Sequence, residues 1–333
     1  MFVTLAWLIS ASAIVGNGIL IYLIAFRQRL RSVTQNWFIL SLAVADLFVG
    51  ATYFPYNRGC NDTGCSQRHV HWLCVDLFLS ASVTNVCLLT VDRYIAIVKP
   101  LQYLTFATKL KAVLAITAAW FFPIITALLP LSWTYTPLLP STEEYSWKIF
   151  LIGTLIVYGI IPCVFLSLAI IHIILIVRKW RIQRSLVITQ LEFNYSRPPR
   201  EKQLQAVKEM SSVRLVVSVV VLFLTCYLCG VCVRAMTVFG QQYQYPPDSV
   251  RKISIILILA NSALNPVAYG LFKDDLKKEL LCSFKRVWKG GSWSRIPAPF
   301  SRESRIPHVF HQFPESRFSF PEKYIKKSNF YKS

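Results

Sequence analysis

The chain has 333 residues, 54% of them hydrophobic, and its mean hydropathy of +0.47 is typical of a protein that lies largely in a membrane. Its 36 Lys and Arg residues against 16 Asp and Glu give a formal net charge of +20. Because this excess lies beside the ends of apolar stretches, where an anionic inner leaflet attracts it, the charge indicates membrane topology and argues against a nucleic-acid-binding protein.

Seven long apolar stretches account for the hydropathy, and each is close to or above the roughly 20 residues that a helix needs to cross a bilayer. They lie at residues 2–26, 36–57, 70–97, 109–131, 148–177, 209–237 and 251–271. They lack the alternating pattern of barrel strands, so the need to pair backbone groups inside lipid predicts helices. The sequence therefore predicts an all-α fold, a seven-transmembrane helix bundle within residues 1–286.

The orientation of the bundle follows from Lys and Arg in the short loops. None precedes the first stretch, which also lacks the cleavage site of a signal peptide, whereas Arg27, Arg29 and Arg31 follow it directly. We therefore expect a multi-pass plasma-membrane protein whose N-terminus lies outside. An odd number of crossings then places the C-terminus in the cytoplasm.

Several polar residues lie deep inside the apolar stretches. Asp46, within Leu42-Ala43-Val44-Ala45-Asp46, is near the middle of the second stretch, Ser82 is in the third, and the seventh carries Asn261, Ser262 and Asn265. An ionisable group at membrane depth is costly and needs oxygen or amide partners. This set could form a small cation site or a purely structural polar cluster, and composition alone leaves both open.

Two motifs close apolar stretches: Asp92-Arg93-Tyr94 the third, and Asn265-Pro266-Val267-Ala268-Tyr269 the seventh. After the seventh, Phe272, Leu276, Leu280 and Phe284 recur at helical spacing between lysines, which predicts a short amphipathic eighth helix on the inner leaflet.

Cys282 in that helix is a palmitoylation candidate, with a plain buried cysteine as the alternative. Residues 287–333 carry Ser-Arg-Ile-Pro twice among Ser, Arg, Pro and Phe, without helical period, and are expected to form a disordered basic cytoplasmic tail.

Together with Gly16-Asn17, Trp120, Pro162 and Phe223, these motifs make residues 1 to about 286 resemble the rhodopsin-like (class A) G-protein-coupled receptors, nearest to the biogenic-amine branch. The resemblance implies a non-enzymatic receptor that couples a small extracellular ligand to a heterotrimeric G protein, and possible arrestin binding to the tail. It also implies no cofactor except an allosteric sodium ion. The residues that match the family's sodium site are Asp46, Ser82, Asn261, Ser262 and Asn265.

The resemblance further assigns a set of coupling and switch residues. Arg93 matches the arginine that contacts the G protein, and Glu209 matches the glutamate that holds this arginine at rest. A charge-assisted clasp between two helix ends would break when the sixth helix moves outward. The full set is Asp92, Arg93, Tyr94, Glu209, Phe223, Asn265, Pro266 and Tyr269.

Three departures from the family affect the switch. Tyr227 replaces the sixth-helix tryptophan, Cys229 replaces the kinking proline, and Ile170 replaces the fifth-helix tyrosine. They leave open an alternative, a receptor-like protein with weak or no signalling that acts as a decoy, scaffold or dimer partner. A transporter is not favoured because the sequence shows no internal repeat.

The expected ligand site also departs from the amine branch. Val75 occupies the position of the amine-binding aspartate, and the acid is next to it at Asp76. If Asp76 and Arg234 both face inward, they could bind a zwitterion or bind each other. The other expected cavity residues are Leu79, Tyr56, Tyr158 and Tyr227.

The family's outer disulfide has no counterpart, since Arg68 stands where its third-helix cysteine would be. Instead, Cys60 and Cys65 flank a short stretch of the first outer loop, where an oxidising environment would allow a bridge, with two free thiols as the alternative. Asn61 on the same loop heads an N-x-T glycosylation sequon.

Overall fold

The computed structural model describes the backbone of residues 2–53, 68–99, 102–103, 105, 108–134, 140–194, 200–240 and 246–288. Side chains are described over the same ranges except at 68–72, 140–141, 181, 184–194, 200–212 and 284–288. Every regular element in these residues is helical, which confirms the all-α prediction.

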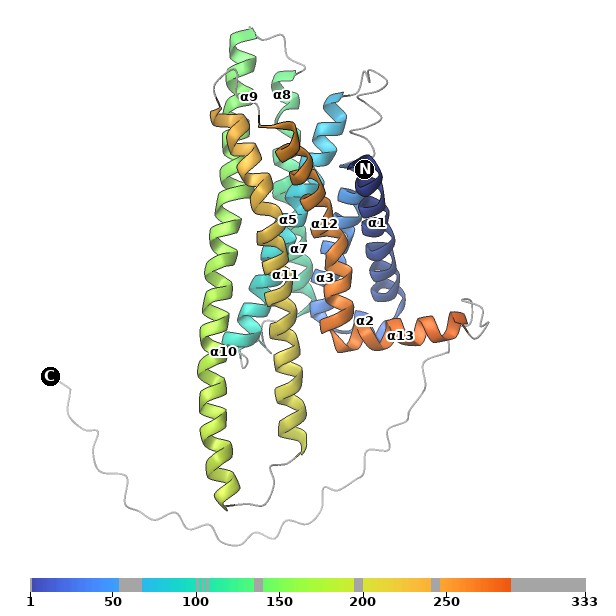
Figure 1. Ribbon diagram of the computed structural model, residues 1–333, viewed down its shortest axis with the longest axis vertical. Coiled ribbons are helices and arrows are strands. Elements are labelled where there is room, and N and C mark those ends of the chain that lie inside the picture. The colour runs from blue at the N-terminus through green and yellow to red at the C-terminus, as the bar shows by residue number, and fades with distance from the viewer. Residues whose placement is uncertain are drawn as a thin grey trace, which may run out of the picture. The chain divides into compact units, whose positions relative to one another are not determined.

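Seven helical segments are long and apolar enough to cross a membrane, as predicted. The first four segments are α1 (Phe2–Phe26), α3 (Thr34–Thr52), α5 (Arg68–Val98) and α7 (Lys109–Leu128). The fifth combines α9 (Pro140–Thr154), η1 (Leu155–Ile160) and α10 (Ile161–Asn194), and the last two are α11 (Arg200–Phe239) and α12 (Asp248–Phe272). The short α2 (Gln28–Arg31) lies between α1 and α3, and α8 (Leu131–Thr134) follows α7 at the end of the fourth segment. Figure 1 shows the long helices side by side in one bundle.

The amphipathic helix predicted after the seventh span is present as α13 (Asp274–Trp288), which lies across the end of the bundle (Figure 1). Leu276 is fully buried against the bundle core, whereas Lys277 and Lys278 are exposed. An apolar face toward the bundle and a basic face away from it are what a helix on a membrane surface requires. The predicted tail at 287–333 lies outside the described residues except for Val287 and Trp288, the last two residues of α13.

The fifth span contains a feature that the sequence reading did not anticipate. Its middle is a π-helix, η1, which ends just before Pro162 in the first turn of α10. Proline has no N–H for the carbonyl of Tyr158 four residues earlier, so regular α-helical bonding is interrupted at this point.

The core of the bundle is apolar, and the outside is apolar too. Tyr269, Phe223 and Ile173 are buried in one cluster between the helices, while Leu8, Phe122 and Leu168 are exposed on the outer surface. Large exposed apolar side chains on several helices are unusual for a protein in water and are expected for one whose solvent is lipid.

Close contact between α1 and α12 depends on a small residue. A Cβ atom on Gly16 would lie 3.1 Å from Cγ of Pro266, a tight contact that glycine avoids. In the next position, the Asn17 side-chain amide donates to the Ser262 carbonyl across 3.0 Å. The Gly16-Asn17 motif therefore holds α1 beside the polar part of α12.

Candidate functional site

Asp46 lies at the centre of a buried polar cluster that joins three helices. Its Oδ1 accepts hydrogen bonds from the Ser82 hydroxyl of α5 at 2.8 Å and from the Ser262 hydroxyl of α12 at 3.0 Å. Its Oδ2 accepts from the Asn265 amide at 2.7 Å. Since Asp46 is 0% exposed, these bonds replace water as the partners of a carboxylate in the middle of the bundle.

Two of the predicted sodium residues have buried oxygen atoms without partners. Oδ1 of Asn261 and Oδ1 of Asn265 are buried and have no hydrogen-bond partner among the described residues. A carboxylate with hydroxyl and amide oxygens is the donor set of a hard cation. The chemistry of the predicted sodium residues therefore fits such an ion, with Asp46 supplying the charge.

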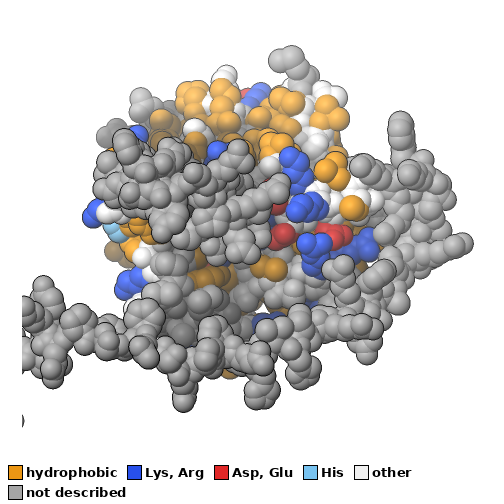
Figure 2. All heavy atoms as spheres, turned by 90° about the horizontal axis from the view of Figure 1, so that it is seen from below, with side chains coloured by type: hydrophobic (Ala, Val, Ile, Leu, Met, Phe, Trp, Pro, Cys, Tyr) orange, Lys and Arg blue, Asp and Glu red, His pale blue; other side chains and the backbone are white. Residues whose placement is uncertain are grey.

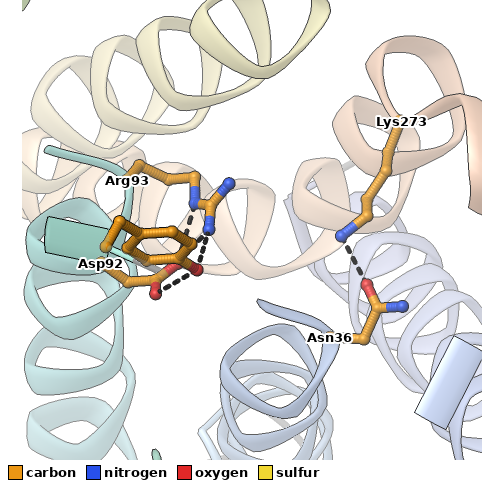
Figure 3. Close-up of polar contacts among 5 residues, drawn as sticks. Asn36, Asp92, Arg93 and Lys273 are labelled. Carbon is orange, nitrogen blue, oxygen red and sulfur yellow. Dashed lines mark hydrogen bonds and ion pairs between the residues drawn. The ribbon is translucent and has the colours of Figure 1, made fainter. Parts of the chain in front are cut away.

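A second polar group lies at the inner end of α5. Arg93 is only 7% exposed, and its Nε and Nη2 donate to Oδ2 of Asp92 at 2.8 Å and 2.5 Å. Nη2 also donates to the Tyr103 hydroxyl at 2.8 Å, and that hydroxyl donates to Oδ1 of Asp92 at 3.0 Å. Figure 3 shows Arg93 turned toward Asp92 in this closed arrangement.

Tyr103, which follows the third span, was missed in the sequence reading because nothing in its local sequence marks it. Burial raises the pKa of its hydroxyl to about 12, so it stays protonated and able to donate at neutral pH. Its ring also lies under the Arg93 guanidinium, 5.5 Å from the ring centroid. Tyr103 and Asp92 together hold Arg93 in place.

Two other predicted switch residues, Glu209 and Tyr94, have different surroundings. Glu209 lies on α11, but its side chain is outside the described residues, so the clasp predicted for it stays a prediction. The hydroxyl of Tyr94 pairs with Nδ1 of His172 on α10 at 2.6 Å. Tyr94 therefore links α5 to α10.

Lys273, between α12 and α13, is a buried cation that the sequence reading treated as one of several basic inner residues. It is 7% exposed and donates to Oδ1 of Asn36, whose amide donates to the Leu30 carbonyl at 2.7 Å. Figure 3 shows Lys273 turned toward Asn36 on the other side of the view from Arg93. Burial, with a smaller contribution from the Arg93 charge, lowers the pKa of Lys273 to about 7.

The altered sixth helix has its own contact with the fifth. The Tyr227 hydroxyl donates to the Tyr158 carbonyl at 3.0 Å, and this is the carbonyl that Pro162 leaves without its usual donor. The Tyr227 ring stacks on Phe223, with centroids 4.7 Å apart. The replacement of tryptophan by tyrosine thus ties α11 to the irregular turn of the fifth span.

Tyr269 illustrates another departure. It is fully buried, and its hydroxyl has no hydrogen-bond partner among the described residues. Ile170, which stands at the position of the family's fifth-helix tyrosine, is buried in the same apolar cluster and offers no hydroxyl. Asn265 and Pro266 of the same motif lie on α12, with Asn265 bonded to Asp46 as described above.

A cavity of about 310 Å³ opens near the other end of the bundle. Of the predicted ligand residues, Val75, Asp76, Leu79, Tyr227 and Arg234 line it. The lining residues that the sequence reading missed include Tyr53, Thr154, Gly159, Gly230, Thr237 and Ser254. Spacing along one helix cannot show which residues of its neighbours face the same space.

Two predicted ligand residues are not among those lining the cavity. The Tyr158 side chain is 3% exposed and its hydroxyl pairs with the Thr126 hydroxyl at 2.9 Å, toward α7. Tyr56 lies outside the described residues. Tyr158 is connected to the cavity residue Tyr227 through its backbone carbonyl.

Two facing walls of the cavity carry opposite charges. Nη2 of Arg234 on α11 lies 2.8 Å from Oδ1 of Asp76 on α5. The two side chains are 29% and 22% exposed, so the pair borders the open space rather than being sealed in the core. Of the two possibilities for these residues, the structure shows them bound to each other.

The remaining predicted modification sites are only partly covered. Cys282 on α13 is exposed, as a lipidated cysteine must be before modification. Cys60, Cys65 and Asn61 lie outside the described residues, so their predicted bridge and glycan stay predictions.

Comparison with known proteins gives one family and a consistent set of relatives. The model of the 7 transmembrane receptor (rhodopsin family) matches residues 16–269. Octopamine receptor beta-2R of Chilo suppressalis is 28% identical, with 90% of this chain and 88% of the receptor covered. Adenosine receptor A2a of Cavia porcellus is 25% identical over 91% and 79%, and the D(1C) dopamine receptor of Xenopus laevis is 26% identical over 81% and 64%.

Proposed function

Because this chain belongs to the rhodopsin family of seven-transmembrane receptors, in its class A near the biogenic-amine branch, we propose that it converts binding of a small extracellular ligand into activation of a heterotrimeric G protein. Members of this family are signalling receptors and not enzymes. The observation that carries the proposal is the closed arrangement of Arg93 with Asp92 and Tyr103 at one end of the bundle.

In the proposed orientation, the Arg93 end faces the cytoplasm and the 310 Å³ cavity faces outside. The support is the distribution of basic residues. Arg27, Arg29 and Arg31 follow α1 directly, and Lys and Arg side chains gather among apolar ones at the end of the bundle seen in Figure 2. An excess of positive charge marks the cytoplasmic side of a membrane protein.

The proposed switch is the release of Arg93 when the inner end of α11 moves outward. At rest, Asp92 and Tyr103 together satisfy the guanidinium, so little of it is available to a partner. A G protein that binds the freed arginine would stabilise the open state, and ligand and G protein would favour each other through this shared equilibrium.

The altered sixth helix contacts the fifth span through Tyr227. We expect the Tyr227 hydroxyl, bonded to the Tyr158 carbonyl, to hold α11 against the fifth span at rest. Breaking that bond would remove one of the contacts that hold α11, alongside the Arg234–Asp76 pair. Its cost is small, about 1 kcal/mol, which suits a switch rather than a permanent contact.

The Asp46 cluster is proposed to bind a sodium ion that favours the resting state. Asp46, Ser82, Asn261, Ser262 and Asn265 would hold it through oxygen atoms. The ion would supply a positive charge next to a buried carboxylate, and its loss would weaken the contacts among α3, α5 and α12.

The ligand class that the relatives suggest is a small amine. Octopamine and dopamine receptors are among them, although an adenosine receptor is as well. Asp76 is an acid in the cavity, and it is paired with Arg234. Arrestin binding to the tail remains part of the proposal.

The test is recruitment of G-protein subtypes to the receptor at the cell surface, with and without a panel of small metabolites. An Arg93→Ala variant at matched surface level should lose recruitment at least tenfold. Arg251→Ala is the matched control, because it removes an exposed arginine at the opposite end of the bundle. We expect this control to recruit normally.

Two results would count against the proposal. Recruitment that survives Arg93→Ala would mean that the closed arrangement is not the switch. No recruitment of any subtype by surface-expressed receptor would favour a receptor-like protein without signalling.

A further inference from the structure

The cavity presents one anion and one cation, and each already satisfies the other. Asp76 projects from α5 and Arg234 from α11, and their nearest oxygen and nitrogen atoms are 2.8 Å apart. A ligand that enters this space meets a neutral pair rather than a free carboxylate. The cavity therefore differs from a site that offers one unpaired carboxylate to an ammonium group.

A simple amine would therefore gain little by binding Asp76. Its ammonium group would take the place of Arg234, and the guanidinium would be left in a partly buried site without its carboxylate. Leaving one member of such a pair without a partner costs more than the pair itself is worth. A simple acid has the corresponding cost, because it would displace Asp76 from Arg234 and leave the Asp76 carboxylate without its partner.

A ligand with both charges avoids this cost. Its ammonium group can bind Asp76 while its carboxylate binds Arg234, so both protein charges and both ligand charges remain paired. We propose that the ligand of this cavity is a small zwitterion, an α-amino acid with an apolar side chain, rather than a simple amine. This inference rests on the proposed function only in treating the cavity as the receptor's ligand site.

The rest of the cavity supports an apolar side chain of modest size. Leu79, Leu155, Val231 and Ile258 line it beside the charged pair. Its volume of about 310 Å³ is at the lower end of the roughly 300–1,000 Å³ of small-molecule sites. The lining thus provides an apolar wall for a side chain and a charged wall for an amino-acid backbone.

Two glycines allow the walls of the cavity to pack closely. Gly159 of the fifth span and Gly230 of α11 both line the cavity. A Cβ atom on Gly230 would lie 3.0 Å from Cδ1 of Ile258, and one on Gly159 would lie 3.4 Å from side-chain atoms of Val231. Both glycines therefore let α11 pack closely against α12 and the fifth span beside the cavity.

The experiment measures binding through the thermal stability of the purified, full-length receptor in detergent. Three probes share one skeleton: L-phenylalanine, 2-phenylethylamine, which lacks the carboxylate, and 3-phenylpropionate, which lacks the ammonium group. L-leucine with its matching amine and acid forms a second set. In each set, the amino acid should reach half-maximal stabilisation at a concentration roughly tenfold below that of either partial ligand.

Variants of Asp76 and Arg234 should change which of the three probes binds most tightly. In Arg234→Gln, 2-phenylethylamine should bind at least as well as phenylalanine, since no guanidinium is left unpaired. In Asp76→Asn, 3-phenylpropionate should do so instead. The double variant Asp76→Asn with Arg234→Gln removes both charges together, so it avoids an unpaired group in the empty cavity, and it should lose the preference for the zwitterion.

Amines that stabilise the unmodified receptor as well as the amino acids do would overturn the proposal. Absence of stabilisation by both amino acids would also overturn it. So would variants that change the overall stability of the receptor but leave the ranking of the probes by affinity unchanged. The measurement needs no G protein. Binding without recruitment would leave this inference intact and count against the proposed function, and recruitment without amino-acid binding would do the reverse.

Discussion

At the scale of single residues, Lys273 carries a titratable group that changes its charge near neutral pH. It is 7% exposed, and its pKa is lowered from 10.5 to about 7, mainly by burial and further by Arg93, while Asp275 and Asp92 act in the opposite direction. Its proton is therefore lost in the folded receptor near neutral pH but kept in the unfolded chain until much higher pH.

This difference predicts how stability changes with pH. Between pH 7 and about 10 the unfolded state binds more protons at this site, so the free energy of unfolding should rise with pH, by at most about 1.4 kcal/mol per pH unit. Below pH 7 both states are protonated and the contribution of Lys273 is at its lowest. Thermal unfolding of the receptor in detergent between pH 6 and 9 measures the effect.

Lys273→Met should remove this pH dependence. Lys277→Met is the matched control, because Lys277 is exposed on the neighbouring helix and should leave the slope unchanged. Equal slopes for the unmodified receptor and Lys273→Met would show that Lys273 does not titrate in this range.

The same scale shows what the sequence could predict of the site. Asp46 and its partners were predicted because a carboxylate in an apolar stretch demands polar neighbours, and the structure brings Ser82, Ser262 and Asn265 to it. Lys273 and Tyr103 were missed, since a lysine or tyrosine next to a span is ordinary. Only the packing of other elements buries them.

At the scale of elements, the contact between α11 and the fifth span combines two sequence features that were interpreted separately. Pro162 was recognised as a family feature and Tyr227 as a departure, but their connection through the Tyr158 carbonyl requires the π-helix η1. No local pattern in Leu155–Ile160 distinguishes a π-helix from an α-helix, because both leave the same apolar residues inside lipid.

Tyr227→Phe tests this contact. Removal of the hydroxyl should lower the free energy of unfolding by about 1 kcal/mol and raise ligand-independent G-protein recruitment, because the resting tie to the fifth span is lost. Tyr158→Phe is the control, since it keeps the carbonyl and removes only the hydroxyl bonded to Thr126. Basal recruitment that is unchanged or reduced in Tyr227→Phe, relative to this control, would contradict the role assigned to the tie.

At the scale of the whole molecule, helix number and order were predictable because the bilayer requires about 20 apolar residues for each crossing. The span limits were less certain. The second span is described only as far as Tyr53, so its predicted end at 57 lies outside the described residues, and the fifth, Thr142–Trp180, is longer than the predicted 148–177. Length depends on how each helix continues beyond the membrane, which hydropathy does not record.

The Asp46 cluster acts at this scale because it joins α3, α5 and α12. If sodium binds there, replacing choline with sodium at constant ionic strength should raise the unfolding temperature, increasingly with concentration. Asp46→Asn should abolish the rise while keeping a side chain of the same shape. A sodium effect of equal size in both proteins would place the ion elsewhere.

The 40 residues of α11 form one unbroken helix without proline, about 60 Å long at 1.5 Å per residue. Under the proposed switch, loss of the Tyr227 contact would let such a helix tilt as one rigid body. A tilt at the Arg234 end would then also displace the opposite end. In that mechanism, a ligand that changes the separation of Asp76 and Arg234 would move the inner end of α11 without a hinge along the helix.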